Sequence, residues 1–156
     1  MKNLRKTLAV SLALLAVLIF TAAVITAETN KEMFISESYG SVMIKKSGTS
    51  EFVPVKKDMQ LAINDAIKTG KNSYCEIAFD KEMETMVSIK ENSLLVINKA
   101  SIDSMSNKEE TLLDLQSGSV MTKVKKLTTE ASQFKIKTPT SIVGVRGTNF
   151  EIKVVE

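Results

Sequence analysis

A two-residue alternation of apolar and polar side chains recurs along the chain from residue 28 onward. It is clearest in residues 75–79, 120–124, 133–137 and 149–154. Successive side chains of a β-strand point to opposite faces, so a run of this kind buries one face and exposes the other. The pattern therefore predicts half-buried antiparallel strands and an all-β fold.

Turn-forming residues separate these runs. Gly, Asn and Ser are frequent in them, and they lie at 47–48, 69–72, 91–92, 101–110 and 117–118. Turns that recur about every 8 to 12 residues are typical of a sandwich, a barrel or a solenoid. We therefore expect a single antiparallel domain that is either solenoid-like or sandwich-like.

The segment 57–68 fits two local structures. Asp58 is placed to cap a short helix. An extended segment would instead put Met59, Leu61 and Ile63 on one face. We favour the extended form because the neighbouring segments have strand patterns.

The tetrapeptide Gly-Ser-Val-Met occurs twice, at 40–43 and at 118–121, each time with a lysine two residues further on. A repeat of this length indicates, weakly, that the domain contains two similar half-units.

The first 27 residues have the pattern of an export segment. Lys2, Arg5 and Lys6 precede the run 7–27, which has no charged residue. This order is typical of a signal peptide, although a run of about 20 apolar residues can also span a bilayer as a helix. We favour cleavage and keep an uncleaved anchor as the alternative. Either way the rest of the chain is expected outside the cytoplasm, in a periplasmic or extracellular location.

This pattern divides the chain into three parts. We predict a signal peptide or membrane anchor at 1–27, which would form one apolar helix, a spacer at 28–36 and a β domain at 37–156.

Composition excludes several classes of function. The chain has no His and a single cysteine, Cys75, which rules out an intrachain disulfide, a zinc site built from Cys and His, and histidine catalysis. From residue 28 onward 18 basic and 18 acidic side chains balance, which argues against a nucleic-acid binder. We expect no catalytic residue, no metal and no cofactor. Cys75 alternates with Ile77 and Phe79, so we expect a small buried side chain rather than a reactive thiol.

Arg146 is the only arginine after residue 27, where the chain otherwise has 17 lysines. A planar guanidinium binds carboxylates by directed hydrogen bonds. One hypothesis is that Arg146 is buried against an acidic partner, with Asp65 as the first candidate. The alternative is an exposed arginine on a turn.

Four short motifs, in order along residues 39–154, resemble those of the FecR-type domain. Their members are Asp65, Thr69, Gly70, Asn72 and Ser73 in the first, Glu91, Asn92 and Ser93 in the second, Gly118 in the third, and Thr138, Pro139, Gly144, Arg146, Gly147, Thr148 and Phe150 in the fourth. The resemblance implies an all-β, solenoid-like extracytoplasmic domain. That domain is best known from transmembrane regulators of iron-dicitrate uptake, which contact a receptor outside and a sigma factor inside.

Only about six residues precede the apolar run, so direct sigma-factor binding is not expected. We expect a non-enzymatic module that senses or scaffolds by binding an envelope protein or a cell-wall or secreted ligand. It would also contact the membrane if residues 7–27 stay uncleaved. The alternative is a structural envelope protein that self-associates through sheet edges. We also expect that an unpaired final strand would dock onto a partner.

Overall fold

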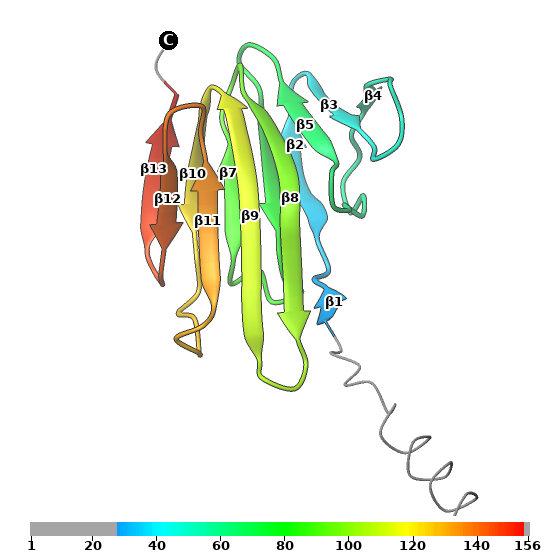
Figure 1. Ribbon diagram of the computed structural model, residues 1–156. Coiled ribbons are helices and arrows are strands. Elements are labelled where there is room, and N and C mark those ends of the chain that lie inside the picture. Colours follow the sequence, from blue (N-terminus) through cyan, green and yellow to red (C-terminus); the bar gives the residue numbers. More distant parts are fainter. Residues whose placement is uncertain (1–27, 155–156) are drawn as a thin grey trace, which may run out of the picture.

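Two β-sheets face each other in the computed structural model, which describes residues 28–154. The described part contains thirteen strands and no helix (Figure 1). Within it, nothing forms a helix that could cross a membrane. The predicted signal or anchor at 1–27 lies outside the described residues.

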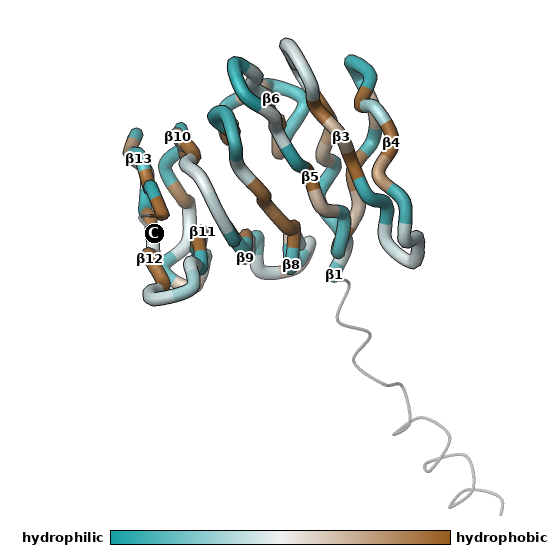
Figure 2. Tube along the Cα trace, turned by 90° about the horizontal axis from the view of Figure 1, so that it is seen from above, coloured by the Kyte–Doolittle hydropathy of each residue, from teal (hydrophilic) through white to brown (hydrophobic). Residues whose placement is uncertain are grey.

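The larger sheet has eight strands in the order β12-β11-β9-β8-β5-β3-β4, with β1 beside β8. Its strands are β1 (Glu28–Asn30), β3 (Val42–Lys45), β4 (Val53–Pro54), β5 (Ala66–Thr69), β8 (Leu94–Asp103), β9 (Lys108–Ser117), β11 (Gln133–Lys137) and β12 (Ile142–Val145). The smaller sheet has five strands in the order β13-β10-β7-β6-β2. Its strands are β2 (Phe34–Tyr39), β6 (Tyr74–Ala78), β7 (Met86–Ile89), β10 (Ser119–Lys123) and β13 (Asn149–Lys153). Figure 2, which views the molecule from above, shows the two sheets as two rows of strands.

The all-β prediction is confirmed, because the four alternating runs coincide with β6, β10, β11 and β13. Their apolar positions face the space between the sheets. In β11, for example, Phe134 and Ile136 are buried while Gln133 and Lys137 are exposed. The segment 57–68 forms no helix; it consists of turns and a single bridge before β5, with Leu61 buried.

The prediction of a purely antiparallel domain is wrong at one place. β11 lies parallel to β9, whereas the other strand pairs are antiparallel. The reason is the connection 124–132, which crosses from the five-stranded to the eight-stranded sheet at the lower end of the molecule (Figure 1). β11 therefore starts at the same end as β9 and runs in the same direction. The architecture is a two-layer sandwich and not a regular solenoid.

Residues 28–36, predicted as a spacer, pack into the domain. β1 pairs with the end of β8. Met33 and Ile35 are buried in the core. The predicted boundary at residue 27 lies outside the described residues.

The core consists mainly of aliphatic side chains from both sheets. The five-stranded sheet contributes Ile77, Val87 and Ile89, and the eight-stranded sheet contributes residues such as Leu95 and Leu113, all fully buried. An aromatic pair joins the layers, since Phe79 follows β6 and Phe134 lies on β11. Their ring centroids are 5.9 Å apart in an edge-to-face arrangement.

Thr122 on β10 is fully buried, and within residues 28–154 its hydroxyl has no hydrogen-bond partner. A buried hydroxyl without a partner loses its hydration and gains nothing in return. Thr122→Val keeps the shape, so we expect it to raise the free energy of unfolding by about 1 kcal/mol and the melting temperature by about 3 °C. Thr69→Val is the matched control, because it removes a buried hydroxyl with two partners and should destabilise. A loss of stability in Thr122→Val, measured by thermal unfolding, would contradict the prediction.

Cys75 on β6 is fully buried, as expected for a small core side chain. Burial, together with the nearby charge of Glu76, raises the pKa of the thiol to about 12. Thiolate is the reactive form. We therefore expect native protein to resist a thiol-specific alkylating reagent at neutral pH and to be labelled fully in denaturant. Rapid labelling of the folded protein, detected by mass spectrometry, would show that this strand opens easily.

Candidate functional site

The motif residues of the sequence fall into three places in the fold. Eight of them lie in or next to a row of turns at the upper end of the sandwich: Thr69, Gly70, Asn72, Ser73, Glu91, Asn92, Ser93 and Gly118. Asp65 lies at the opposite end of β5. The remaining seven lie on β12, β13 and the turns beside them.

At the upper end, the chain crosses between the sheets at four turns (Figure 1). We call these turns the corner row; it comprises residues 40–41, 70–73, 90–93 and 118–119. Backbone hydrogen bonds join neighbouring turns. The Gly70 N–H donates to the Ser41 carbonyl at 2.8 Å, the Asn92 N–H to the Gly70 carbonyl at 3.1 Å and the Lys90 N–H to the Ser119 carbonyl at 2.9 Å.

Two serine hydroxyls also join neighbouring turns of the corner row, each by accepting a backbone N–H. The N–H of Ser41 donates to Ser73 Oγ, and the N–H of Ser119 donates to Ser93 Oγ, both at 2.9 Å. Each accepting hydroxyl in turn donates to a carbonyl two residues earlier in the chain. Each of these serines follows an asparagine in the left-handed region, with φ of 52° and 53°. The two corners therefore share the same hydrogen bonds and the same backbone conformation.

A glycine faces each of these serines. Gly40 and Gly118 have φ of 77° and 80°, which favours glycine. A Cβ at Gly40 would lie 2.4 Å from Ser73 Oγ, and a Cβ at Gly118 would lie 2.1 Å from Ser93 Oγ. The repeated Gly-Ser-Val-Met thus marks the two equivalent corners, which gives a structural basis to the weak indication of two half-units.

Thr69 and Asn72 link the corners further. The buried Thr69 hydroxyl donates to the Lys90 carbonyl and accepts the Ser93 N–H at 3.0 Å. The Asn72 N–H donates to a carboxylate oxygen of Glu91 at 2.6 Å. Thr69, Gly70, Asn72, Ser73 and Gly118 are therefore brought together as a frame, and the hydroxyls among them are bonded to backbone groups.

The expectation of an Arg146–Asp65 pair is wrong. Asp65 is fully buried, but it accepts from Lys46 Nζ at 2.6 Å and from the backbone N–H groups of Ser47 and Ala62 at 2.8 and 2.9 Å. It holds the ends of the loop 46–65 together. Asp65 precedes β5, which is three strands away from β11, the neighbour of β12.

Arg146 itself is exposed, as the alternative had it. It lies just past β12, at the turn towards β13, and its Nη2 donates to the Thr129 carbonyl at 3.3 Å. Arg146→Ala is therefore not expected to cost the several kcal/mol of a broken buried pair.

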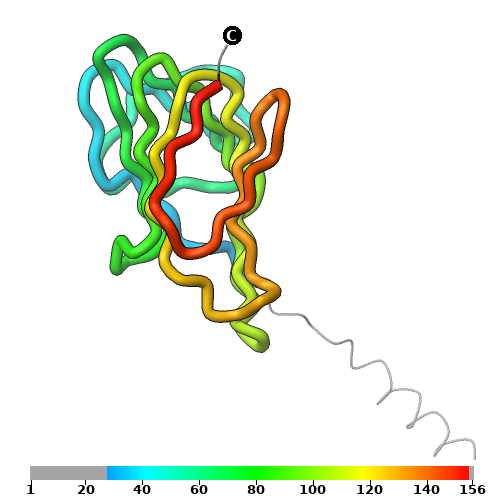
Figure 3. The backbone as a smooth tube through the Cα atoms, turned by 90° about the vertical axis from the view of Figure 1, so that its left-hand side faces the viewer, coloured from blue at the N-terminus to red at the C-terminus, as the bar shows by residue number. Residues whose placement is uncertain are grey.

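The rest of the fourth motif shapes two turns and an edge. Thr138 closes the β11–β12 hairpin around Pro139, since its N–H donates to the Ser141 carbonyl at 2.8 Å and its hydroxyl accepts the Ser141 N–H at 3.1 Å. Gly144 lies on β12 with open space around it. Gly147 and Thr148 connect to β13, where Phe150 is half-buried. Figure 3 faces this end of the sandwich, with β12 and β13 in front of the two layers.

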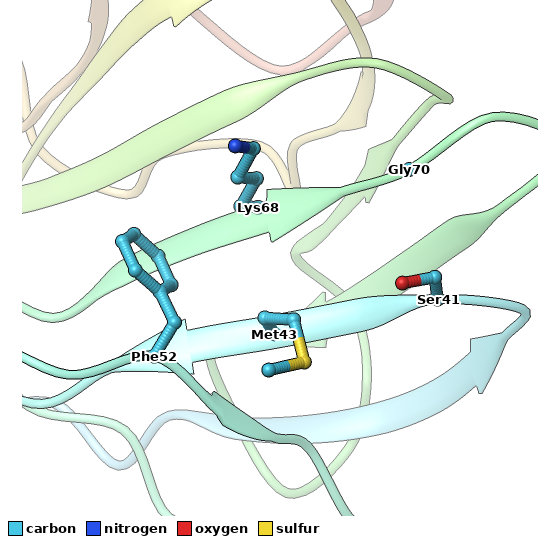
Figure 4. Close-up of a pocket in the computed structure, with 5 residues that line it drawn as sticks. All are labelled: Ser41, Met43, Phe52, Lys68 and Gly70. Carbon is cyan, nitrogen blue, oxygen red and sulfur yellow. The ribbon is translucent and has the colours of Figure 1, made fainter.

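A shallow hollow of about 260 Å³ lies on the outer face of the eight-stranded sheet beside the corner row. It is lined by Ser41, Met43, Phe52, Lys68 and Gly70. In Figure 4, Met43 and Lys68 lie on adjacent strands, with Phe52 at one end of the hollow and Ser41 and Gly70 at the other. We call this the corner hollow. It presents an aromatic ring, a thioether, an ammonium group and a hydroxyl to the solvent, a mixture suited to binding.

Sequence reasoning did not select this hollow as a site. Gly70 was identified as a residue of the FecR-type motifs, and Ser41 and Met43 as part of the repeated tetrapeptide, but Phe52 and Lys68 were not singled out. The alternation in β3 and β5 does place Met43 and Lys68 on the solvent side of their strands. That the two strands are neighbours became apparent only from their pairing.

A buried group of charges lies at the lower end of the molecule. Glu109 on β9 points between the sheets and contacts Lys31 Nζ at 2.7 Å and Lys125 Nζ at 3.0 Å. The Glu109 and Lys31 side chains are 9% and 8% exposed. Burial acts to raise the pKa of Glu109, but the hydrogen bonds and charges of the two lysines outweigh it, so the pKa is lowered. These three groups satisfy one another inside the fold.

Residues 28–154 contain no group of three or more Asp, Glu or Cys side chains arranged to hold a metal ion. The geometry thus defines an all-β module whose motif residues build its turns, with a hollow beside them.

The family model of the FecR protein matches residues 65–156. This is more than half of the chain, so the chain belongs to the FecR family, as the resemblance implied. The match begins at Asp65 and includes every motif residue named above. The FecR domain indicates a module of the signal-transduction regulator kind. Comparisons with curated proteins and with solved structures gave no match.

Proposed function

We propose that the chain is a non-enzymatic, extracytoplasmic FecR-like module that senses or scaffolds by binding another envelope protein or a cell-wall or secreted ligand. The observation that carries this proposal is the corner hollow. Ser41 and Gly70 belong both to the corner row and to the lining of the hollow. The family motif, through Gly70, therefore lies directly beside a surface that can bind.

The chemistry of the hollow supports a partner with apolar and acidic groups. Phe52 is 37% exposed, and Lys45 Nζ lies 5.7 Å from its ring centroid. Lys68 is exposed on β5. An aromatic ring flanked by lysines favours a ligand that combines an apolar body with negative charge.

A binding role also agrees with the state of the serine hydroxyls in the corner row and of the buried Cys75 thiol on β6. The Ser73 hydroxyl donates to the Lys71 carbonyl, the Ser93 hydroxyl lies 3.1 Å from both the Glu91 and the Ser119 carbonyl oxygens, and each hydroxyl accepts one backbone N–H. The pKa of Cys75 is raised, which disfavours its thiolate. Activation of a nucleophile requires a base or a lowered pKa.

Photo-crosslinking in cells tests the binding surface. A photoreactive phenylalanine analogue at Phe52 should form an adduct with a molecule other than this chain, and Lys68→Glu should reduce the yield. The same analogue at Tyr39, an exposed aromatic residue on the five-stranded sheet, is the control. Equal adducts from both positions, or none from position 52, would refute the corner hollow as the site. Adducts only with the chain itself would instead favour the structural, self-associating protein.

Export can be tested separately with a phosphatase reporter that is active only outside the cytoplasm, fused after Glu156. The full chain should give an active reporter, and a chain that starts at residue 28 should not. An inactive reporter on the full chain would contradict the proposed location.

A further inference from the structure

The two edges of the five-stranded sheet are β13 and β2. Within the described residues, β13 pairs only with β10. Its exposed face carries Glu151 and Lys153, while Phe150, Ile152 and Val154 pack against the core yet stay half-buried. An edge strand offers a row of unpaired N–H and C=O groups for pairing with another strand. A partner strand would also bury the apolar surface that Phe150, Ile152 and Val154 still expose.

The hydrogen bonds to β10 show which backbone groups of β13 are free. The Val154 N–H donates to the Gly118 carbonyl at 2.8 Å, and the Val124 N–H donates to the Thr148 carbonyl at 3.2 Å. In an antiparallel pair, bonded residues alternate with residues whose groups point the other way. The residues at even positions, 148 to 154, therefore bond to β10. The N–H and C=O groups of Asn149, Glu151 and Lys153 point to the open edge.

We propose that β13 pairs antiparallel with β13 of a second copy of this chain, about a two-fold axis through Ile152. This register joins Glu151 of each copy to Lys153 of the other through their free backbone groups. It therefore places opposite charges directly across from each other, twice. On the inner face Ile152 meets Ile152 of the second copy, and Phe150 meets Val154 of the second copy.

Axes through other residues of the strand are also compatible with the free backbone groups, but each of them pairs the charges less well. An axis through Glu151 would place two Glu151 carboxylates opposite each other, which is destabilising. An axis through Phe150 would put Glu151 opposite Asn149 and leave Lys153 opposite the turn residue Gly147. Only the axis through Ile152 pairs both charges with their opposites. This self-complementarity is what a two-fold interface requires and is the reason for assigning the edge to a second copy.

The pairing would extend the five-stranded sheet across the two-fold axis. The corner hollow would stay accessible, because it lies at β3 and β5 of the eight-stranded sheet, whereas the contact between the copies is made by β13 of the five-stranded sheet. The dimer would therefore carry two free hollows. The inference does not depend on the proposed binding function.

Charge reversal tests the register. We expect the full chain, purified in one non-ionic detergent, to dimerise with concentration in analytical ultracentrifugation. Glu151→Lys and Lys153→Glu should each weaken dimerisation by about tenfold or more, since each creates two like-charge pairs. The double variant should restore it. Glu37→Lys, on the opposite edge strand β2, is the matched control and should have no effect.

Cysteine cross-linking tests the axis. Residues facing each other in a non-hydrogen-bonded antiparallel pair have Cα atoms about 4.5 Å apart, within the range of a disulfide. Ile152→Cys should therefore form a covalent dimer under mild oxidation, and Tyr39→Cys, on β2, should not. The buried Cys75 is expected to stay reduced in both. A chain that stays monomeric, charge variants that dimerise like the wild type, or equal cross-linking from position 39 would each overturn the proposal.

Discussion

Gly118→Ala is expected to lose about 3 to 5 kcal/mol of unfolding free energy, measured by urea denaturation followed by circular dichroism. The added Cβ would lie 2.1 Å from Ser93 Oγ, 2.6 Å from Ser93 Cα and 2.7 Å from the Asn92 carbonyl oxygen. Two of these atoms belong to the backbone of the corner row, so they cannot move without breaking its hydrogen bonds. The φ of 80° adds a further cost for alanine.

Gly48→Ala is the matched control. Gly48 has nearly the same φ, 78°, but no atom lies within 4 Å of the position of its Cβ. It should therefore lose only about 1 kcal/mol, the cost of the backbone conformation alone. Gly40→Ala, which meets Ser73 Oγ, should resemble Gly118→Ala. Equal losses of unfolding free energy at positions 48 and 118 would mean that the close contact between the corners adds nothing to the cost of the alanine.

Glu109→Ala should also be severe, with an expected loss of about 3 to 5 kcal/mol, because it leaves Lys31 buried without its partner. Lys31 is only 8% exposed, and Lys125 loses the same partner. Glu110→Ala is the matched control. The Glu110 side chain points to the other face of β9 and pairs with Lys99 and Lys108 near the surface. It should cost less than about 1 kcal/mol. Similar losses of unfolding free energy in both variants would show that burial of the charges does not determine the cost.

The same two carboxylates determine how stability responds to acid. The hydrogen bonds from Lys31 and Lys125 outweigh burial and lower the folded-state pKa of Glu109, and those from Lys108 and Lys99 lower the pKa of Glu110 to about 2. The unfolded chain, with ordinary carboxyl pKa values, then binds more protons than the folded one at acidic pH. Their stabilisation is therefore complete above about pH 4.5 and is lost as the pH falls through the folded-state values. Urea unfolding between pH 6 and 3 should show a shallower dependence in Glu109→Ala. An unchanged slope would contradict this assignment.

The strands were predictable because each follows from a local pattern. Burial on one face of a strand requires alternation, and runs such as 133–137 showed it without reference to any distant residue. Turn residues marked the corners for the same reason. Asn72 and Asn92 adopt the left-handed conformation, which asparagine tolerates better than most residues.

The partners of these residues were not predictable from local pattern. One hypothesis placed Arg146 in the interior because it is the only arginine after residue 27 and has apolar neighbours, but neither property says which strands lie side by side. The pairing of Asp65 with Lys46 depends on β3 and β5 being neighbours. Glu109 was not predicted to be buried, although it occupies an inward position of an alternating strand, where a charge is unusual. That position was the signal that could have revealed the buried charges.

The amino-acid order alone determined that this chain forms strands, where it turns, and that it belongs with FecR-type domains, since those properties depend on neighbours in the chain. Only the tertiary structure decided that the two Gly-Ser corners are closed by two Asn-Ser turns, that Glu109 lies between two lysines, and that β13 lies at an edge. The physical reason is that strand order and the crossing between sheets bring together residues tens of positions apart, and no local pattern specifies which strands become neighbours.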